Sequence, residues 1–382
     1  MSKPDRRQVL TSLAALGVGS SVMQPLFTAA SAAPKSSLTS RITRFEITPT
    51  KLPYYEPVRE ALTGSFMLQN RHQTSFDPTM VKIHTDDGLT GICNAMMRSP
   101  ERIESTLKRM VGHSPWEYLH DDSLAGILVA VYDLVGQSAG LPVSRLFSTN
   151  PKEKIVQTWW SQCFPPALMA EEAKRGENLG YKVHKVKARP WQDPIEQAAA
   201  ICDVVKRDFR IWADANSWWG SVGRTIHFCN RLAQFNNYFA IESPIRRPGI
   251  AGYRALKGKV PLQMSEHMTP DPMPYIREGL LDTFVIGGPL GKTLIKRALM
   301  AEVTRMPLWV EHSIEDGINQ VFQAHQAAAF PGIEYTISIT HVLVDDLMKE
   351  PFAMKDGFYT VPTKPGLGVS LDEDAIDKYR TS

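Results

Sequence analysis

The chain has 382 residues, 43% of them hydrophobic and 22% charged, with a formal net charge of +3 at pH 7. This length exceeds what one ordinary hydrophobic core holds, so we expect two domains with the composition of a water-soluble globular protein. Residues 1–32 carry a net charge of +2, and the nearly neutral remainder offers no electrostatic basis for binding nucleic acid or an anionic membrane.

The first residues have the features of an export signal. Arg6 and Arg7 precede a weakly apolar run over residues 9–23, and the small residues 30–32 suit a signal peptidase. This pattern resembles a twin-arginine signal, and a membrane anchor is the alternative. Because the apolar run is short and interrupted by glycines, we expect residues 1–32 to be a signal peptide and the protein to be exported to the periplasm.

The four cysteines have neither metal-ligand spacing nor the density of a disulfide framework. We therefore expect them to be buried free thiols.

Residues 41–150 place strands before helices, which predicts a separate α+β domain. Residues 41–48 and 79–85 alternate apolar and polar side chains, and the latter lead into the turn sequence DDG. From residue 99 to residue 146 the apolar spacing becomes helical. Residues 54–74 show little periodicity, so we expect a long loop there that covers the active site.

Residues 151–350 alternate short β-rich segments with helical segments. Eight such strands predict a closed parallel barrel, and the absence of a glycine-rich loop after the first strand argues against a dinucleotide-binding fold. The predicted strands are 156–160, 184–187, 211–216, 239–244, 262–267, 283–287, 308–312 and 333–338.

Acidic residues stand at the carboxyl ends of three consecutive predicted strands, where barrel enzymes carry their active sites. These residues are Asp214, Glu242 and Glu266. Three carboxylates that converge repel one another, and a hard divalent cation would neutralise that repulsion. Oxygen ligands favour Mg²⁺, and Mn²⁺ suits the same ligands.

Several motifs occur together in an order and spacing that resemble one family. They are HKVKARP (184–190), ADAN (213–216), IESP (241–244), SEH (265–267) and EHS (311–313). Their order resembles the enolase superfamily, in its mandelate racemase and muconate-lactonising branch. The resemblance implies a modified (β/α)₇β barrel over 151–350, with an α+β capping domain over 41–150 that is completed by about 352–382. It also implies one Mg²⁺ held by Asp214, Glu242 and Glu266, and removal of the proton α to a substrate carboxylate.

The same resemblance assigns catalytic roles. On a strand Lys185 and Lys187 point to one face, although two lysines at this spacing are by themselves typical of a solvated strand. The resemblance makes Lys187 the base and Lys185 the neighbour that tunes it. His312 would act on the opposite face of the substrate. The family usually pairs that histidine with a strand-six aspartate, yet the position here is Gly287. A two-base racemase is therefore less favoured than a dehydratase in which His312, or alternatively His267, is the acid.

The remaining candidate residues would contact the substrate. Aromatic faces and a guanidinium suit a polyhydroxylated acid, and the candidates are Asn216, Glu334, Arg189 and Trp218. We expect an acid-sugar dehydratase. A racemase, epimerase or cycloisomerase of the same superfamily and a non-catalytic acid-sugar binding protein are the alternatives. The resemblance also implies a homo-oligomer.

Overall fold

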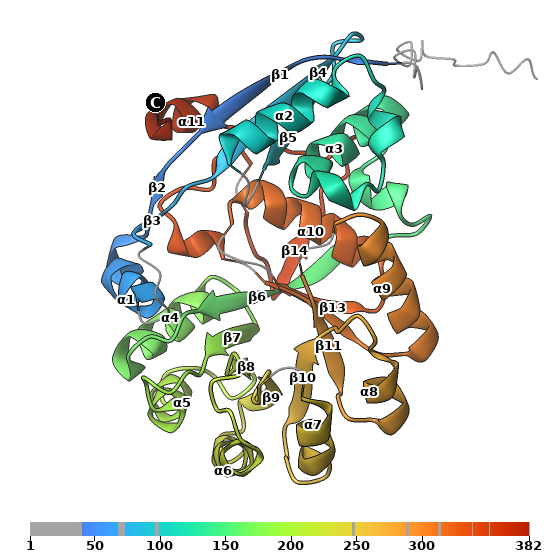
Figure 1. The fold of residues 1–382 in the computed structure, drawn as a ribbon. Coiled ribbons are helices and arrows are strands. Elements are labelled where there is room, and N and C mark those ends of the chain that lie inside the picture. Colours follow the sequence, from blue (N-terminus) through green and yellow to red (C-terminus); the bar gives the residue numbers. More distant parts are fainter. Residues whose placement is uncertain are drawn as a thin grey trace, which may run out of the picture. The chain divides into compact units, whose positions relative to one another are not determined.

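An antiparallel sheet begins the part of the chain that the computed structural model describes. Strand β1 (Ile42–Pro49) pairs with β4 (Thr79–Thr85), which pairs with β5 (Thr90–Asn94) across the predicted turn (Figure 1). The described residues are 40–67, 73–95, 99–246, 249–287, 290–311, 315–337, 339–350 and 352–381. The predicted signal peptide and His312 lie outside them.

Helices follow the sheet, as the apolar spacing predicts. They are α2 (Pro100–Met110) and α3 (Ile127–Ala139), with short 3₁₀ turns η1 (Pro115–Tyr118), η2 (Asp122–Leu124) and η3 (Val143–Leu146). Helix α3 is buried along most of its length, and it packs against β5. The α+β character predicted for this region is confirmed.

The segment predicted as a long loop contains a helix, so that prediction is wrong. Helix α1 (Glu56–Met67) lies between the short paired strands β2 (Leu52–Pro53) and β3 (Ser75–Phe76). It buries Val58, Leu62 and Ser65, which are spaced i, i+4 and i+7 along one face. Only two of these three are apolar, which explains why the period is weak in the sequence.

Eight parallel strands form the barrel. They are β6 (Lys154–Ser161), β7 (Val183–Lys187), β8 (Arg210–Asp214), β9 (Tyr238–Glu242), β10 (Gln263–His267), β11 (Thr283–Ile286), β12 (Leu308–Val310) and β13 (Ile333–Ile337). Each pairs with the next, and β13 pairs back to β6, which closes the barrel. All eight strands coincide with predicted ones.

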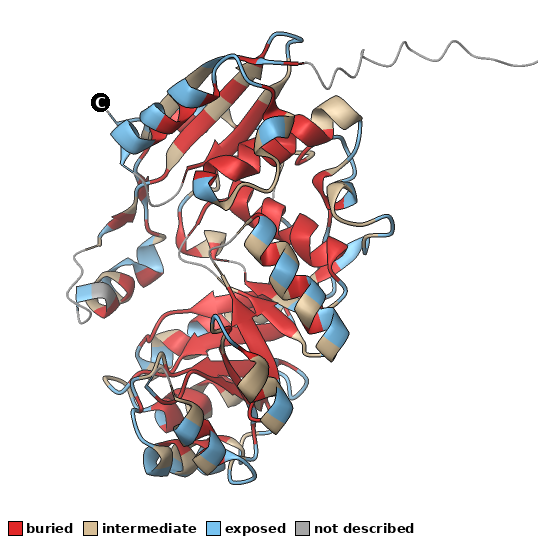
Figure 2. Cartoon of the chain, turned by 45° about the vertical axis from the view of Figure 1, so that its right-hand side comes forward, coloured by how far each residue is buried: buried red, intermediate tan, exposed pale blue. Residues whose placement is uncertain are grey.

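Seven helices alternate with these strands, and no α-helix directly follows β13 among the described residues. They are α4 (Pro166–Asn178), α5 (Pro194–Cys202), α6 (Val222–Leu232), α7 (Ile250–Leu256), α8 (Met273–Glu278), α9 (Lys292–Thr304) and α10 (Gly317–Ala329). This order is the predicted (β/α)₇β arrangement. The strands are almost wholly buried (Figure 2), because side chains fill the interior and helices cover the outside.

The C-terminal segment returns to the elements at the start of the chain. After η4 (Thr340–Val342), strand β14 (Phe358–Thr360) pairs antiparallel with β6, and α11 (Glu373–Tyr379) follows. Thr50 forms a bridge with Arg380, and Lys82 pairs with Glu373 at 2.7 Å. These contacts fit the predicted capping role of the C-terminus, whose boundaries remain a prediction.

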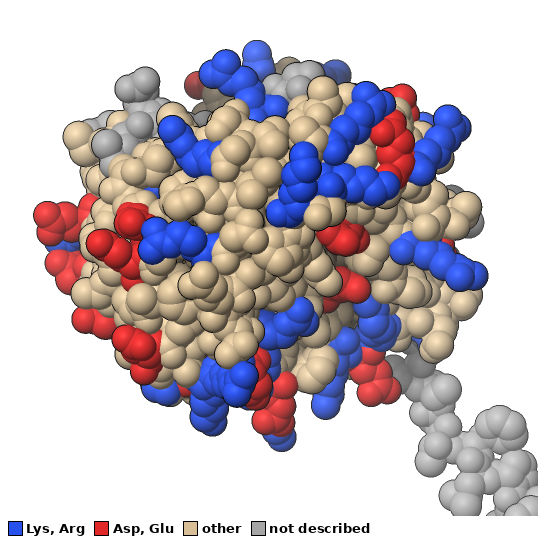
Figure 3. All heavy atoms as spheres, turned by 90° about the horizontal axis from the view of Figure 1, so that it is seen from below, with Lys and Arg blue, Asp and Glu red and all other residues tan. Residues whose placement is uncertain are grey.

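The cysteines and the charged surface residues are arranged as the composition leads us to expect. All four cysteines are free, and Cys93, Cys163 and Cys229 are buried. Acidic and basic side chains are interspersed over the face shown in Figure 3. Within the described residues no helix is long and apolar enough to cross a membrane.

Candidate metal centre and active site

Four residues stand in one row across the carboxyl ends of neighbouring strands. Lys187 on β7 is in register with Asp214 on β8, Asp214 with Glu242 on β9, and Glu242 with Ser265 on β10. Residues in register share a face of the sheet. Lys185, two residues before Lys187, lies on that face one step deeper in the barrel. The convergence predicted for the lysines with Asp214 and Glu242 is therefore present.

Lys185 is the central cation of this row. Its side chain is fully buried, and Nζ lies 2.8 Å from Glu242 Oε2 and 3.3 Å from Asp214 Oδ2, with a closer contact to Glu311. The Trp212 ring lies below it, 4.5 Å from Nζ. Burial alone would lower the pKa of Lys185, but the three carboxylates raise it above its ordinary value.

The pKa values of two carboxylates in the cluster, Asp214 and Glu242, are shifted in opposite directions. Burial would raise the pKa of Asp214, yet Lys187 at 2.5 Å and Lys185 outweigh it and lower that pKa to about 2. Burial, Asp214 and Glu311 together raise the pKa of Glu242. Glu242 is thus the carboxylate whose charge the protein compensates least.

Glu311, the residue directly after β12, reaches the cluster beside a glycine that directly follows β11. A Cβ added at Gly287, just after β11, would lie 2.5 Å from the Glu311 backbone oxygen. The Glu311 backbone N–H also donates to Ile286 O at 2.9 Å. The position where an aspartate was expected is therefore occupied by the backbone of Glu311, and the side chain of Glu311 brings the carboxylate. Sequence reasoning missed Glu311, and Gly287 was the available signal.

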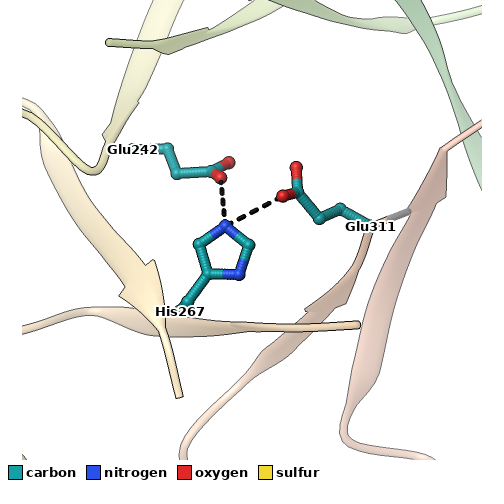
Figure 4. Close-up of side chains that lie close together, drawn as sticks. All are labelled: Glu242, His267 and Glu311. Carbon is teal, nitrogen blue, oxygen red and sulfur yellow. Dashed lines mark ion pairs between the residues drawn. The ribbon is translucent and has the colours of Figure 1, made fainter. Parts of the chain in front are cut away.

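His267 completes a compact group with Glu242 and Glu311 (Figure 4). Its Nε2 lies 2.8 Å from Glu311 Oε1 and 3.3 Å from Glu242 Oε1. Burial alone would lower the pKa of His267, but the two carboxylates raise it to about 9. One atom from each of these residues lies within 4.8 Å of the others, which suits a bound divalent cation.

Glu242 supplies the test of that fit. It is completely buried, and its oxygens contact two cationic side chains, Lys185 Nζ at 2.8 Å and His267 Nε2 at 3.3 Å. A buried carboxylate is costly unless positive charge compensates it, and the raised pKa of Glu242 indicates that these two contacts compensate it incompletely. The group Glu242, His267 and Glu311 therefore fits a divalent cation.

Glu266 does not join this group, and the ligand set predicted from the sequence, Asp214, Glu242 and Glu266, stays a prediction. Adjacent strand residues point to opposite faces, so Glu266 faces the outer helices while Ser265 and His267 face the interior. Glu266 Oε1 accepts from Ser243 Oγ at 2.6 Å and from the His267 backbone N–H at 2.7 Å. Its Oε2 accepts from Tyr253 OH on α7 at 2.8 Å.

Three of the four predicted substrate contacts lie at the rim of the row. Arg189 donates to Asn216 Oδ1 through Nε at 2.9 Å and Nη2 at 2.6 Å. Asn216 donates through Nδ2 to Asp214 Oδ2 at 3.0 Å, which links the rim to the row. Trp218 is 47% exposed and packs edge-on against Trp191.

The backbone beside the row is strained. Asn216, Ser217 and Ser243 have φ values of 47°, 66° and 45°, in the left-handed region that side chains disfavour. Ser243 directly follows Glu242, and Asn216 and Ser217 stand two and three residues after Asp214. Strain of this kind is concentrated at functional sites, which agrees with the placement of the cluster.

Glu334 is not brought to the site. It lies at the amino end of β13, exposed to solvent, and accepts a hydrogen bond from Trp309 Nε1 at 3.2 Å. The site lies at the carboxyl ends of the strands, so this position does not suit substrate binding. Lys292, the first lysine after the sixth barrel strand β11, is also exposed, at the start of α9.

Comparison with known proteins places the chain in a family. The model of the enolase C-terminal domain-like family matches residues 168–375, more than half of the chain. The chain therefore belongs to the enolase superfamily, in the branch of the mandelate racemases and muconate-lactonising enzymes. Enzymes of this superfamily abstract a proton α to a carboxylate, and this chain is accordingly an enzyme of the lyase or isomerase class.

The chain is similar to relatives with different reactions. D-gluconate dehydratase of Thermoproteus tenax is 24% identical over 283 residues, which cover 68% of this chain but only 56% of that protein. Muconate cycloisomerase 1 of Pseudomonas putida is 24% identical over 67% of this chain and 71% of that protein. N-succinyl-L-Arg/Lys racemase of Bacillus cereus is 24% identical over 84% of this chain and 95% of that protein. A crystal structure of N-succinyl Arg/Lys racemase from Bacillus cereus matches at 21% identity, with a TM-score of 0.74, over 90% of this chain and 98% of that chain.

Proposed function

We propose that the protein removes the proton α to the carboxylate of an acid sugar and then eliminates water, with a divalent cation bound beside the reacting carboxylate. The position of Lys187 carries the proposal. Its side chain is 9% exposed and contacts Asp214, whereas Lys185 is completely buried among three carboxylates. Lys187 is therefore the lysine that a substrate can reach, and Lys185 is the residue that positions the surrounding carboxylates.

The cation site supports the same chemistry. An α-proton beside a carboxylate is weakly acidic, and a bound divalent cation would concentrate positive charge next to that carboxylate. The carboxylate oxygens of Glu242 and Glu311 suit a divalent cation such as Mg²⁺ or Mn²⁺. Lys187 would accept the proton as the general base, with Asp214 orienting its amine.

The rim of the site supports an acid sugar as the substrate class. The guanidinium of Arg189 and the amide of Asn216 offer hydrogen-bonding groups for hydroxyls, and the exposed Trp218 ring offers an apolar face. Relatives of the chain include D-gluconate dehydratase and arabinonate dehydratase.

The end of the sixth barrel strand, β11, favours dehydration over racemisation. A racemase that uses two bases needs a second base across the substrate from Lys187. In the described part of this strand end, the inward position is Gly287, and Lys292 is exposed at the next helix. His312 remains the predicted acid for the leaving hydroxyl.

The test is incubation of the protein with a panel of aldonic and aldaric acids and Mg²⁺ or Mn²⁺ in D₂O, followed by proton NMR. We expect loss of the α-proton and formation of a 2-keto acid. Lys187→Ala should abolish both, and Lys182→Ala, which changes an exposed lysine just before β7, should not. Deuterium entering at the α-carbon without net change would indicate a racemase, and a cyclic product a cycloisomerase. If no acid sugar exchanges its α-proton, the proposed substrate class is wrong.

We also propose that residues 1–32 direct export through the twin-arginine pathway and that the mature enzyme is a homo-oligomer. The paired residues Arg6 and Arg7 support the first proposal. Replacing both with lysine should retain the protein in the cytoplasm, which cell fractionation measures. Light scattering of the purified protein tests the second proposal, and a monomer mass would refute it.

A further inference from the structure

Strand β10 contributes no carboxylate to the cation site. Its residue in register with Glu242 is Ser265, whose hydroxyl donates to Ile241 O at 3.4 Å. The one acidic residue on the strand, Glu266, faces the other way and accepts from three donors. An oxygen-only ligand set drawn from β8, β9 and β10 is therefore not available in this arrangement.

A histidine stands where that carboxylate is missing. His267 shares the inward face of Ser265, two residues further toward the mouth of the barrel. Figure 4 shows its ring nitrogen directed at both Glu242 and Glu311, and the two distances are 3.3 and 2.8 Å. Strand β10 thus offers a nitrogen donor, and Glu311, directly after β12, supplies the carboxylate that β10 lacks.

The burial of Glu242 favours positive charge at this place. Its side chain is inaccessible to solvent and lies against Lys185 at 2.8 Å and His267 at 3.3 Å. Two carboxylates and one imidazole form a mixed donor set. Imidazole is a good ligand for Zn²⁺ and other transition metals, whereas Mg²⁺ prefers oxygen ligands throughout.

We propose that His267 binds the cation directly through Nε2, together with Glu242 and Glu311, and that the site consequently binds Zn²⁺ and Mn²⁺ more tightly than Mg²⁺. The inference rests on the cation site of the proposed function and is independent of the substrate. It assigns His267 to the metal and leaves His312 as the predicted acid.

Pulsed EPR of the metal-free full-length protein reloaded with Mn²⁺ tests the ligand directly. We expect electron spin-echo modulation from one coordinated imidazole nitrogen, and His267→Gln should remove it. Glu266→Gln is the matched control, because it changes the adjacent acidic residue on the opposite face and should leave the nitrogen signal unchanged. Circular dichroism should show that both variants are folded.

Calorimetric titration with each metal alone measures how tightly the protein binds Zn²⁺, Mn²⁺ and Mg²⁺. Mn²⁺ and Zn²⁺ should bind the protein more tightly than Mg²⁺, and His267→Gln should weaken Zn²⁺ binding by roughly 10- to 100-fold while changing Mg²⁺ binding far less. Absence of the nitrogen signal in the unaltered protein would overturn the inference. Loss of metal binding in Glu266→Gln, with binding retained in His267→Gln, would also overturn it and restore the ligand set predicted from the sequence. A failure of the proposed function appears instead as an absence of α-proton exchange, with the nitrogen signal intact.

Discussion

Replacement of Lys185 by methionine tests the electrostatics of the cluster most directly. Methionine keeps the length of the side chain and removes its charge. Lys185 lies 2.8 Å from Glu242 and 3.3 Å from Asp214, and it also contacts Glu311, with no part of its side chain exposed. The variant leaves these carboxylates buried without their central cation.

The size of the effect follows from that burial. Removing one partner from a buried ion pair costs about 3–5 kcal/mol, because the remaining charge has lost both water and its partner. We expect a loss of that order in the free energy of unfolding when no divalent cation is present. A cation at the cluster would take over the role of the ammonium group. At a cation concentration of about 100 times Kd, binding stabilises a protein by about 2.7 kcal/mol. At the same cation concentration the variant should gain more than the unaltered protein, because its uncompensated carboxylates should bind the cation with a lower Kd.

The assay is urea unfolding followed by circular dichroism, first in EDTA and then with saturating Mn²⁺. Lys182→Met is the control, since Lys182 is exposed just before the same strand and should change stability by less than about 0.5 kcal/mol. A variant that folds only with the cation present would be the extreme form of the expected result. A Lys185→Met protein as stable in EDTA as the Lys182→Met control would refute the reasoning.

Three further predictions concern other elements of the site and its surroundings. Gly287→Ala places a Cβ 2.5 Å from the Glu311 oxygen, so it should cost about 1–3 kcal/mol of stability and weaken cation binding in titration calorimetry; unchanged affinity would show that the close approach is not required. Asp316 is buried, and burial together with Glu315 raises its pKa to about 8. Between about pH 4 and 8 the folded state therefore binds more protons than the unfolded state, and stability falls as the pH rises. Asp316→Asn should remove this contribution, so that urea unfolding shows the variant gaining stability relative to the unaltered protein between pH 5 and pH 8; a constant difference would contradict the prediction. Glu334→Gln should leave kcat/KM for an active acid sugar within about twofold, because removal of an exposed charge distant from the reacting atoms alters little; a larger loss would restore its predicted substrate role.

Much of the barrel can be predicted from local patterns. Strands covered on both sides are short and rich in apolar residues, as in residues 283–286, and some end in a polar residue at the mouth, as residues 210–214 end in Asp214. The two-residue period also places Lys185 and Lys187 on one face without any tertiary information. Helix α1 was missed because the apolar face that it buries is short.

Contacts between distant strands are decided only when the barrel closes. In the motif SEH, Glu266 and His267 are equally plausible ligands, since a strand exposes alternate residues to opposite faces. The pairing of Ser265 with Glu242 determines that His267 faces the interior. Glu311 meets Lys185 from a position 126 residues away in the chain, and its approach depends on Gly287 in the adjacent strand.

The sequence by itself therefore determined the barrel and the placement of Asp214 and Glu242 at strand ends, because these follow from periodicity. The family and the role expected of Lys187 came from the resemblance of the motifs. The tertiary structure decided which residues lie beside Glu242 in the candidate cation site. Register and close backbone approach bring together side chains that no local pattern relates, and here they place His267 and Glu311, rather than Glu266, beside Glu242.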